Sequence, residues 1–204
     1  MLPEYDFWLL DLDGTVLTVT DGYIERTMSR VAARLDTSFT LEEARSIWFG
    51  RDGLRDDLLS AHGIEPDTFW SVFHRIESPT ERALASRLHP DAEAVLELDR
   101  PRGVVTHCQW YLTDPVLEEL DIRDWFDTVV CCSDSMGWKP DPTPVRYAMD
   151  CLDVNGGNGA LVGDSVADVE AAHNAGLDAI LIQRDGEHLQ SDADLVIDSL
   201  SALA

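Results

Sequence analysis

The sequence has very little lysine: Lys139 is the only one among 204 residues, and the other fourteen basic side chains are arginines. Asp and Glu together number 39, which gives a formal net charge of −24. Nucleic acid is therefore excluded as an expected partner, because neutralising phosphates requires clustered Lys and Arg. An anionic membrane surface is excluded for the same reason.

Long apolar runs are also absent. No uninterrupted apolar segment reaches about eighteen residues, so we expect no membrane-spanning helix. The first residues, MLPEYDFWLLDLDG, have no cationic start and only a short apolar run, so we expect no signal peptide and a cytoplasmic protein. Cysteine is scarce, and no metal-type CxxC pair occurs among the four cysteines, Cys108, Cys131, Cys132 and Cys151. Cys131 and Cys132 adjoin in the apolar run TVVCC, where we expect buried, reduced thiols.

The acidic residues are scattered among apolar segments and not gathered in blocks, which favours a folded chain over a disordered one. Hydrophobic residues make up 45% of the sequence, as in globular proteins. Spread acidity with almost no lysine is similar to the proteins of salt-loving cells, where concentrated ions screen the self-repulsion of the compact state. We therefore interpret the chain as halophilic, with an ordinary acidic protein as the alternative.

Short apolar runs recur along the chain and are bounded by turn residues. Their continuous apolar character is typical of strands that are covered on both faces. They lie at 7–10, 103–108, 128–132, 160–163 and 179–182, with a further run at 195–198. Helix-like segments separate them at 90–99, 113–126, 141–153 and 165–176. Strand alternating with helix predicts an α/β fold, with a Rossmann-like parallel sheet wrapped by helices.

About ninety residues separate the first two predicted strands, far more than one crossover helix requires. Residues from Asp21 to about Ser86 have helical patterns throughout, including a capping-box pattern from Thr40 to Glu43. We interpret this stretch as an inserted, all-helical cap domain. The expected domains are a core formed by residues 1–18 and 87–204, and a cap formed by residues 19–86.

Polar residues follow four of the predicted strands, at the edge of a parallel sheet where ligands bind. They are Asp11, Asp13, Gly14, Thr15, Thr106, His107, Asp134, Lys139, Asp164, Ser165 and Asp168. Carboxylates held close together ionise less readily, so we expect a cation to balance the charge of such a cluster. Oxygen ligands without His or Cys favour Mg²⁺ over zinc. Beside a lysine, such a site can hold a phosphoryl group whose oxygens require positive charge.

Four ordered motifs carry a family resemblance: DLDGTV at 11–16, VVTHC at 104–108, KPDP at 139–142 and GDSVADVEAAHNAG at 163–176. Together they resemble the haloacid dehalogenase (HAD) superfamily, specifically its phosphatase branch with a helical C1-type cap, which includes phosphoglycolate phosphatases. The resemblance covers the chain from Phe7 to about Arg184. Three of the motifs occurring in order, each after a predicted strand, make it specific.

The resemblance implies roles for the matching residues of the first motif and of the lysine. Asp11 resembles the nucleophile that attacks phosphorus and carries an aspartyl-phosphate. Asp13 resembles the general acid that protonates the leaving oxygen and then deprotonates the hydrolytic water. Lys139 would neutralise the charge of the nucleophile and of the phosphoryl group.

The remaining motifs imply a phosphate clamp and metal ligands. Thr106 resembles the residue that binds phosphate oxygens. Asp164 resembles the Mg²⁺ ligand, aided by Asp11 and by the main-chain carbonyl of Asp13, and Asp168 would hold the metal site or its waters.

Three residues are open to two interpretations. His107 stands where the family pattern usually has Asn or a small polar residue, and it is either a substrate contact or a ring that covers the sheet end. Arg51 and Arg55 are spaced i, i+4 and either reach a substrate carboxylate or pair on an exposed helix with Asp52, Asp56 or Asp57.

The motifs therefore predict an enzyme, a phosphoric monoester hydrolase that depends on Mg²⁺ and acts on a small phosphorylated metabolite through an aspartyl-phosphate. By resemblance, phosphoglycolate-type substrates are expected. Alternatives are a phosphomutase, a dehalogenase, which the presence of Asp13 disfavours, and a catalytically silent binding protein. The chain is expected to be a monomer or a homodimer.

Overall fold

The computed structural model describes residues 3–50, 54–154, 157–184 and 189–203. The main sheet of this part of the chain is parallel throughout, with the strand order β5-β4-β1-β6-β7-β8. Its strands are β1 (Phe7–Leu10), β4 (Arg102–Thr106), β5 (Thr128–Cys131), β6 (Gly159–Gly163), β7 (Asp178–Ile182) and β8 (Leu195–Ile197). All six predicted runs are strands, which confirms the predicted fold class.

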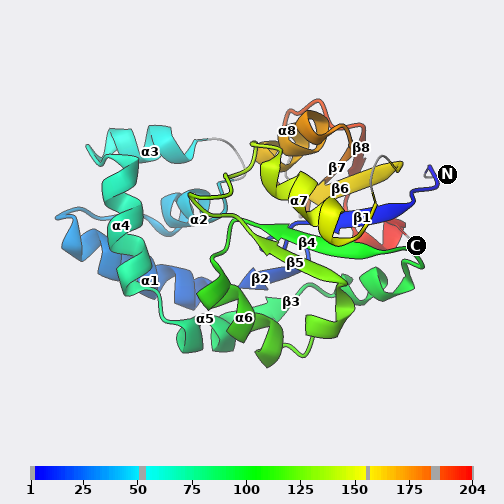
Figure 1. The fold of residues 1–204 in the computed structure, drawn as a ribbon. Helices are drawn as coiled ribbons and strands as arrows, with labels where there is room; N and C mark the ends of the chain where they lie inside the picture. The colour runs from blue at the N-terminus through cyan, green and yellow to red at the C-terminus, as the bar shows by residue number, and fades with distance from the viewer. Residues whose placement is uncertain (1–2, 51–53, 155–156, 185–188, 204) are drawn as a thin grey trace.

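Two layers cover the two faces of this sheet. Along β1, Phe7 and Leu9 pack into one apolar cluster and Trp8 and Leu10 into another, because successive side chains of a strand point to opposite faces. The first cluster is closed by the helices α7 (Thr143–Cys151) and α8 (Val166–Ala175). The second is closed by α6 (Trp110–Glu119) and by the 3-10 helices η1 (Ala92–Glu97), η2 (Arg123–Trp125) and η3 (Leu200–Leu203). Figure 1 shows α7 and α8 on one side of the sheet and α6 on the other.

The insertion after β1 is helical, as predicted. Its helices are α1 (Asp21–Arg34), α2 (Leu41–Phe49), α3 (Arg55–Ala61), α4 (Pro66–Ile76) and α5 (Pro79–Ala85). The capping box of Thr40 and Glu43 starts α2, and Gly50 ends it in a left-handed conformation. Tyr23, Phe69 and Phe73 belong to an apolar cluster separate from the two clusters of the sheet. The insertion thus has a core of its own.

A two-stranded antiparallel ribbon joins the insertion to the sheet. It consists of β2 (Leu17–Val19) and β3 (Ser86–Leu88), with Leu17 opposite Leu88 and Val19 opposite Ser86. The chain therefore leaves and re-enters the core at neighbouring points. Both predicted domain boundaries fall within this ribbon, and the exact division stays a prediction. The last helix before the return, α5, packs against α6 of the core, and its Ala83 belongs to a sheet cluster.

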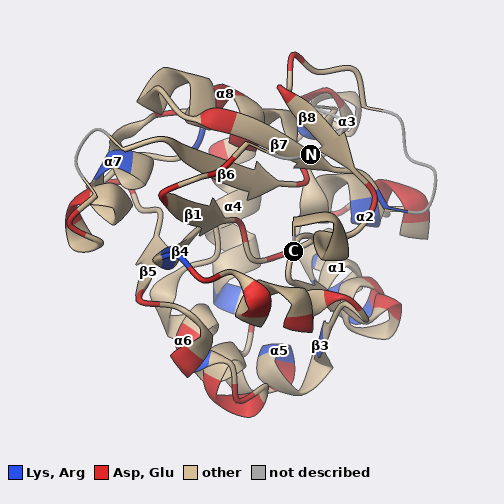
Figure 2. Cartoon of the chain, turned by 90° about the vertical axis from the view of Figure 1, so that its right-hand side faces the viewer, with Lys and Arg blue, Asp and Glu red and all other residues tan. Residues whose placement is uncertain are grey.

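Acidic residues are spread over the helices and loops of the whole chain, with few basic residues between them (Figure 2). No helix of the described residues is long and apolar enough to cross a membrane. All four cysteines are free thiols; of the two in the TVVCC run, Cys132 is buried as expected and Cys131 is only partly buried.

Candidate active site

A cavity of about 880 Å³ lies between the carboxyl ends of the main sheet and the inserted helices. From the core, the strand-end residues Asp11, Thr106 and Asp164 line it. From the insertion, Trp48 and Arg55 line it. Predicted site residues of the core therefore share one cavity with Arg55 of the insertion.

Lys139 is buried in the floor of this cavity and joins three strand ends. Its Nζ donates to Asp11 Oδ1 at 2.7 Å, to Asp168 Oδ1 at 2.6 Å and to the main-chain oxygen of Val105 at 2.9 Å. The side chain of Lys139 is 2% exposed. An ammonium fits here because it is compact and has three donors, whereas a planar guanidinium needs more room. This contact explains why one lysine stands in a chain that otherwise uses arginine.

Two local features place Asp168 beside the lysine. Its Oδ2 accepts from the main-chain nitrogen of Ser165 at 3.1 Å and its main-chain nitrogen donates to Ser165 Oγ at 3.3 Å, which together form the capping box at the start of α8. Asp168 Oδ2 also accepts from Ser165 Oγ at 2.6 Å. Gly163, the last residue of β6, leaves room for it, because a Cβ there would come within 2.3 Å of the side chain of Asp168. The carboxylate is thus shared between the helix cap and Lys139.

Asp11, Asp164 and Asp168 form a buried group of carboxylates, each with an oxygen within 4.8 Å of the others. Burial raises the pKa of Asp11 well above its usual value, and the charges of Asp168 and Asp164 add to this effect, while Lys139 opposes it. Burial alone would also raise the pKa of Asp168, but Lys139 and Ser165 bring it below its usual value.

Three carboxylates therefore face one ammonium. A divalent cation would offset the excess negative charge, and the all-oxygen donors are those that Mg²⁺ prefers. The group consequently fits a magnesium ion. The predicted ligands Asp11, Asp164 and Asp168 are brought together in it, whereas the side chain of Asp13 lies outside it and any contribution there would come from its main-chain carbonyl, as expected.

The carboxylate of Asp13 has a different partner. Arg82 on α5 donates to Asp13 Oδ1 from one terminal nitrogen, and it donates to Ser86 Oγ at 3.1 Å from the other. The side chain of Arg82 is 2% exposed and that of Asp13 is 21% exposed. Burial would lower the pKa of Arg82, but Asp13 raises it above its usual value. The guanidinium is therefore a fixed positive charge at the cavity wall.

Thr106 is the last residue of β4 and His107 follows it, and both line the cavity. Thr106 is buried, and its Oγ1 accepts from the main-chain nitrogen of Cys108 at 3.0 Å. The ring of His107 lies edge-on to Trp138, with centroids 5.7 Å apart, and its Nε2 has no hydrogen-bond partner within the described residues. Burial lowers the pKa of His107 to about 3, and the charge of Lys139 adds to this, so the ring is neutral near pH 7.

Of the two cap arginines predicted as site residues, Arg55 lines the cavity, and Arg51 lies outside the described residues together with Asp52. Arg55 Nε donates to the main-chain oxygen of Ile47 at 2.7 Å, and one terminal nitrogen donates to that of Trp48 at 3.0 Å. Its guanidinium also lies 5.1 Å from the ring centroid of Trp70. These contacts hold the cation at the cavity wall.

Sequence reasoning missed Arg82, and it also missed two neighbours of the cavity, Glu77 and His74. His74 lies on α4 and its Nε2 is 3.2 Å from Gln109 Nε2 of the core, so it joins the two sides of the cavity. No local pattern distinguishes Arg82 from the exposed Arg87 five residues later. Only the fold of the return segment shows which of the two is buried.

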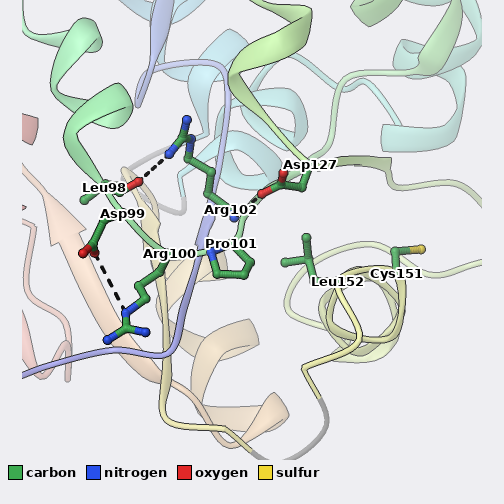
Figure 3. A pocket seen from close by; sticks show the side chains of 8 residues that line it. All are labelled: Leu98, Asp99, Arg100, Pro101, Arg102, Asp127, Cys151 and Leu152. Atoms are coloured by element: carbon green, nitrogen blue, oxygen red, sulfur yellow. Dashed lines mark hydrogen bonds and ion pairs between the residues drawn. The ribbon is translucent and has the colours of Figure 1, made fainter.

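A second hollow, of about 530 Å³, lies at the opposite end of the strands, where β4 begins (Figure 3). The main-chain nitrogen of Arg102 donates there to Asp127 Oδ2 at 2.9 Å, and the side chain of Arg102 donates to the main-chain oxygen of Leu98. These contacts tie the loop before β4 to the loop before β5. The described lining contains none of the carboxylates of the main site.

A Rossmann-like sheet that ends in buried carboxylates and a lysine, under an inserted helical cap, is the architecture of a class of hydrolases. The haloacid dehalogenase-like hydrolase family matches residues 8–182, and the chain belongs to this family. This result confirms the predicted family and the prediction of a hydrolytic enzyme.

Several relatives extend over nearly the whole chain. A phosphoglycolate phosphatase of Cupriavidus necator is 30% identical, over 96% of this chain and 90% of that protein. An N-acetylmuramic acid 6-phosphate phosphatase of Pseudomonas putida is 24% identical, over 93% of this chain and 90% of that protein.

Solved structures show the same fold. A HAD phosphatase from Thermococcus onnurineus superposes with a TM-score of 0.69 at 26% identity, over 97% of this chain and 95% of that one. A haloacid dehalogenase-like family protein from Streptococcus pneumoniae gives a TM-score of 0.78 at 15% identity, over 98% and 96%.

Proposed function

We propose that this protein is a Mg²⁺-dependent phosphatase that hydrolyses small phosphate monoesters through an aspartyl-phosphate on Asp11. The observation that carries the proposal is the contact of Lys139 Nζ with Asp11 Oδ1 at 2.7 Å, beside the carboxylates of Asp164 and Asp168. Groups more than a hundred residues apart in the sequence thus meet where a phosphoryl group would lie. The phosphatases among the relatives support the same reaction.

In the proposed reaction, a carboxylate oxygen of Asp11 forms a bond to phosphorus while the bond from phosphorus to the ester oxygen breaks. Asp13 gives its proton to the departing oxygen, and the alcohol leaves. Asp13 then takes a proton from water, whose oxygen bonds to phosphorus as the bond to Asp11 breaks. Phosphate is released, Asp11 is restored as a carboxylate and Asp13 is again protonated.

The chain's other residues bind and orient the phosphoryl group. Lys139 and the hydroxyl of Thr106 lie beside the phosphate oxygens and stabilise their charge. Asp11, Asp164 and the main-chain carbonyl of Asp13 would hold Mg²⁺, with Asp168 fixing the site from behind. When bound, the ion supplies positive charge to the nucleophile and to the phosphoryl oxygens.

The cap would select the substrate. Arg55 and the neutral ring of His107 line the cavity, and Arg51 lies on the same segment of the sequence as Arg55. A cation opposite the phosphate site favours an ester with a second anionic group, as in phosphoglycolate. We further propose that the enzyme works in the cytoplasm of a salt-rich cell, on a small phosphorylated metabolite. It would be a monomer or a homodimer, and the boundaries between its core and its cap would lie near residues 18 and 87.

The test is release of phosphate from para-nitrophenyl phosphate in molar salt, with and without Mg²⁺, by the wild type and by Asp11→Asn. We expect release that requires both the ion and Asp11, and a phosphoenzyme that forms in the wild type alone. Equal rates for the two proteins would remove the enzyme proposal and leave a silent binding protein. A panel of phosphoglycolate, sugar phosphates and nucleotides then identifies the substrate class, and isomerised sugar phosphate without free phosphate would indicate a mutase.

A further inference from the structure

The buried ion pair of Arg82 with Asp13 is not explained by the phosphate chemistry above. Arg82 lies on α5, which packs against α6 of the core, and its guanidinium lines the cavity. Its partners come from three parts of the chain: the loop after β1, which carries Asp13, the return strand β3, which carries Ser86, and the cap helix α2, which carries Trp48.

Asp13 needs such a partner to keep one orientation. It stands two residues from Asp11 in a cavity whose floor holds three buried carboxylates, and repulsion would turn an unpaired carboxylate toward solvent. Its side chain keeps 21% exposure, so packing alone does not fix it. A guanidinium with directed donors restricts both the position and the plane of the carboxylate.

Arg82 is itself held rigidly. Its other terminal nitrogen donates to Ser86 Oγ at 3.1 Å, and Ser86 Oγ in turn donates to the main-chain oxygen of Arg82 at 2.9 Å. The guanidinium carbon lies 5.7 Å from the ring centroid of Trp48, which packs edge-on against Tyr23 and Phe73. The arginine is thus fixed on one side by the return strand and on the other by the cap.

We infer that Arg82 is the positioning residue for the general acid: it holds the Asp13 carboxyl group where the oxygen of the leaving alcohol departs. This inference rests on the proposed function, because it needs Asp13 to give a proton to that oxygen. Arg82 acts on the reaction through Asp13 and needs no contact of its own with the reacting atoms.

Leaving groups of different basicity distinguish this role from a purely structural one. Para-nitrophenolate departs without much help from an acid, whereas phenolate needs a proton more, and the two aryl phosphates have similar shapes. In Arg82→Met we expect kcat/KM to fall about tenfold more for phenyl phosphate than for para-nitrophenyl phosphate. The difference should lie in kcat/KM, which reports formation of the phosphoenzyme, because hydrolysis of the phosphoenzyme is the same step for both esters.

Arg87→Met is the matched control. Arg87 is exposed on β3 and donates to the main-chain oxygens of Leu84 and Ser86, so it belongs to the same return segment without lining the cavity. We expect it to leave the ratio of the two rates within about twofold. Arg82→Lys keeps a cation at the same place, and we expect it to shift the ratio in the same direction by a smaller factor.

A double-mutant cycle tests the route through Asp13. In an Asp13→Asn background, Arg82→Met should lower the phenyl phosphate rate by less than about threefold further, because the acid is already absent. The inference is overturned if Arg82→Met or Arg82→Lys lowers the rates with phenyl phosphate and with para-nitrophenyl phosphate by the same factor. It is also overturned if the rate losses of the two single variants multiply in the double variant, or if the wild type cleaves para-nitrophenyl phosphate but not phenyl phosphate. A wild type that cleaves neither ester contradicts the proposed function itself.

Discussion

The two halves of the cavity each supply one buried cation to one aspartate of the first motif. In the core half, Lys139 contacts Asp11, and in the half next to the cap, Arg82 contacts Asp13. The partners of Lys139 lie directly after β1, in β4 and in the first turn of α8, all in the core, whereas Arg82 comes from the return segment of the insertion. In the proposed reaction the two halves have separate tasks: the core would stabilise charge at phosphorus, and the return segment and cap would act at the leaving group.

The largest effect should come from the core half, with Lys139→Arg and Lys139→Met. The ammonium fits between oxygens at 2.6 to 2.9 Å, and a guanidinium has no room for the same contacts. We expect both variants to lose at least about a thousandfold in kcat with every ester, because Met removes the fixed charge at the reacting centre and Arg cannot place its charge at the same point. Phosphate release under saturating Mg²⁺ measures this.

An Arg82→Lys variant tests the difference between the two cations in the same assay. It replaces arginine by lysine in the half next to the cap, whereas Lys139→Arg replaces lysine by arginine in the core half. It should retain far more activity toward para-nitrophenyl phosphate than Lys139→Arg. If Lys139→Arg keeps more than about a tenth of the wild-type kcat, the distinction between the two cations is wrong.

A smaller effect is expected from Arg55→Gln in the cap. Loss of a charged hydrogen bond to a second anionic group of the substrate weakens binding by about 1.5–3 kcal/mol. We therefore expect KM for phosphoglycolate to rise roughly 10- to 100-fold, while KM for para-nitrophenyl phosphate stays within about threefold. Steady-state kinetics with both esters measures the difference.

Arg45→Gln is the cap control for this variant. Arg45 is an exposed cap arginine that pairs with Asp21, and its loss should change neither KM. An equal rise of KM for both esters in Arg55→Gln would show that Arg55 only maintains the cap, as its contacts with Ile47 and Trp48 allow.

The core half was predictable from the sequence because its signals are local. Apolar runs locate β1, β4 and β6, and the residue after each run is placed at the sheet edge by parallel topology alone. Ser165 and Asp168 form a capping box, and their spacing in the sequence already indicates it. The residues of the main cluster were therefore identified correctly as neighbours before their distances were known.

The other half was not predictable in the same way. Arg82 reaches Asp13 across 69 residues of sequence, and the contact depends on how α5 packs on α6. The short ribbon of β2 and β3 was also missed, because three-residue strands leave little periodicity. Tertiary packing determines which arginine of the insertion is buried, and the helical pattern of the sequence does not predict it.

Low salt should destabilise the core and the cap alike, because acidic residues are spread over both (Figure 2). With a net charge of −24, dilution from molar to about 50 mM potassium chloride removes screening and increases repulsion in the compact state. We expect the melting temperature to fall by about 5–10 °C. An unchanged melting temperature would contradict the halophilic interpretation, and a separate early transition would show that one half is weaker than the other.

The smallest effect expected concerns Asp11 in the absence of metal. Because the pKa of Asp11 is raised in the folded protein, its charged form opposes folding: the stabilising contribution is present below the unfolded pKa of about 4 and is lost as the pH rises through the folded value. Asp11→Asn cannot ionise, so with a chelator at pH 7.5 it should melt about 2–4 °C above the wild type.

The pH and the metal ion provide the two controls for this comparison. At about pH 3 or below, Asp11 is protonated in both states of the wild type, and the difference in melting temperature should shrink toward zero. Added Mg²⁺ should raise the melting temperature of the wild type more than that of Asp11→Asn, because the ion offsets the charge that only the wild type carries. A variant less stable than the wild type under chelation would mean that Lys139 alone balances the carboxylates of the core half, and the need for a cation there would disappear.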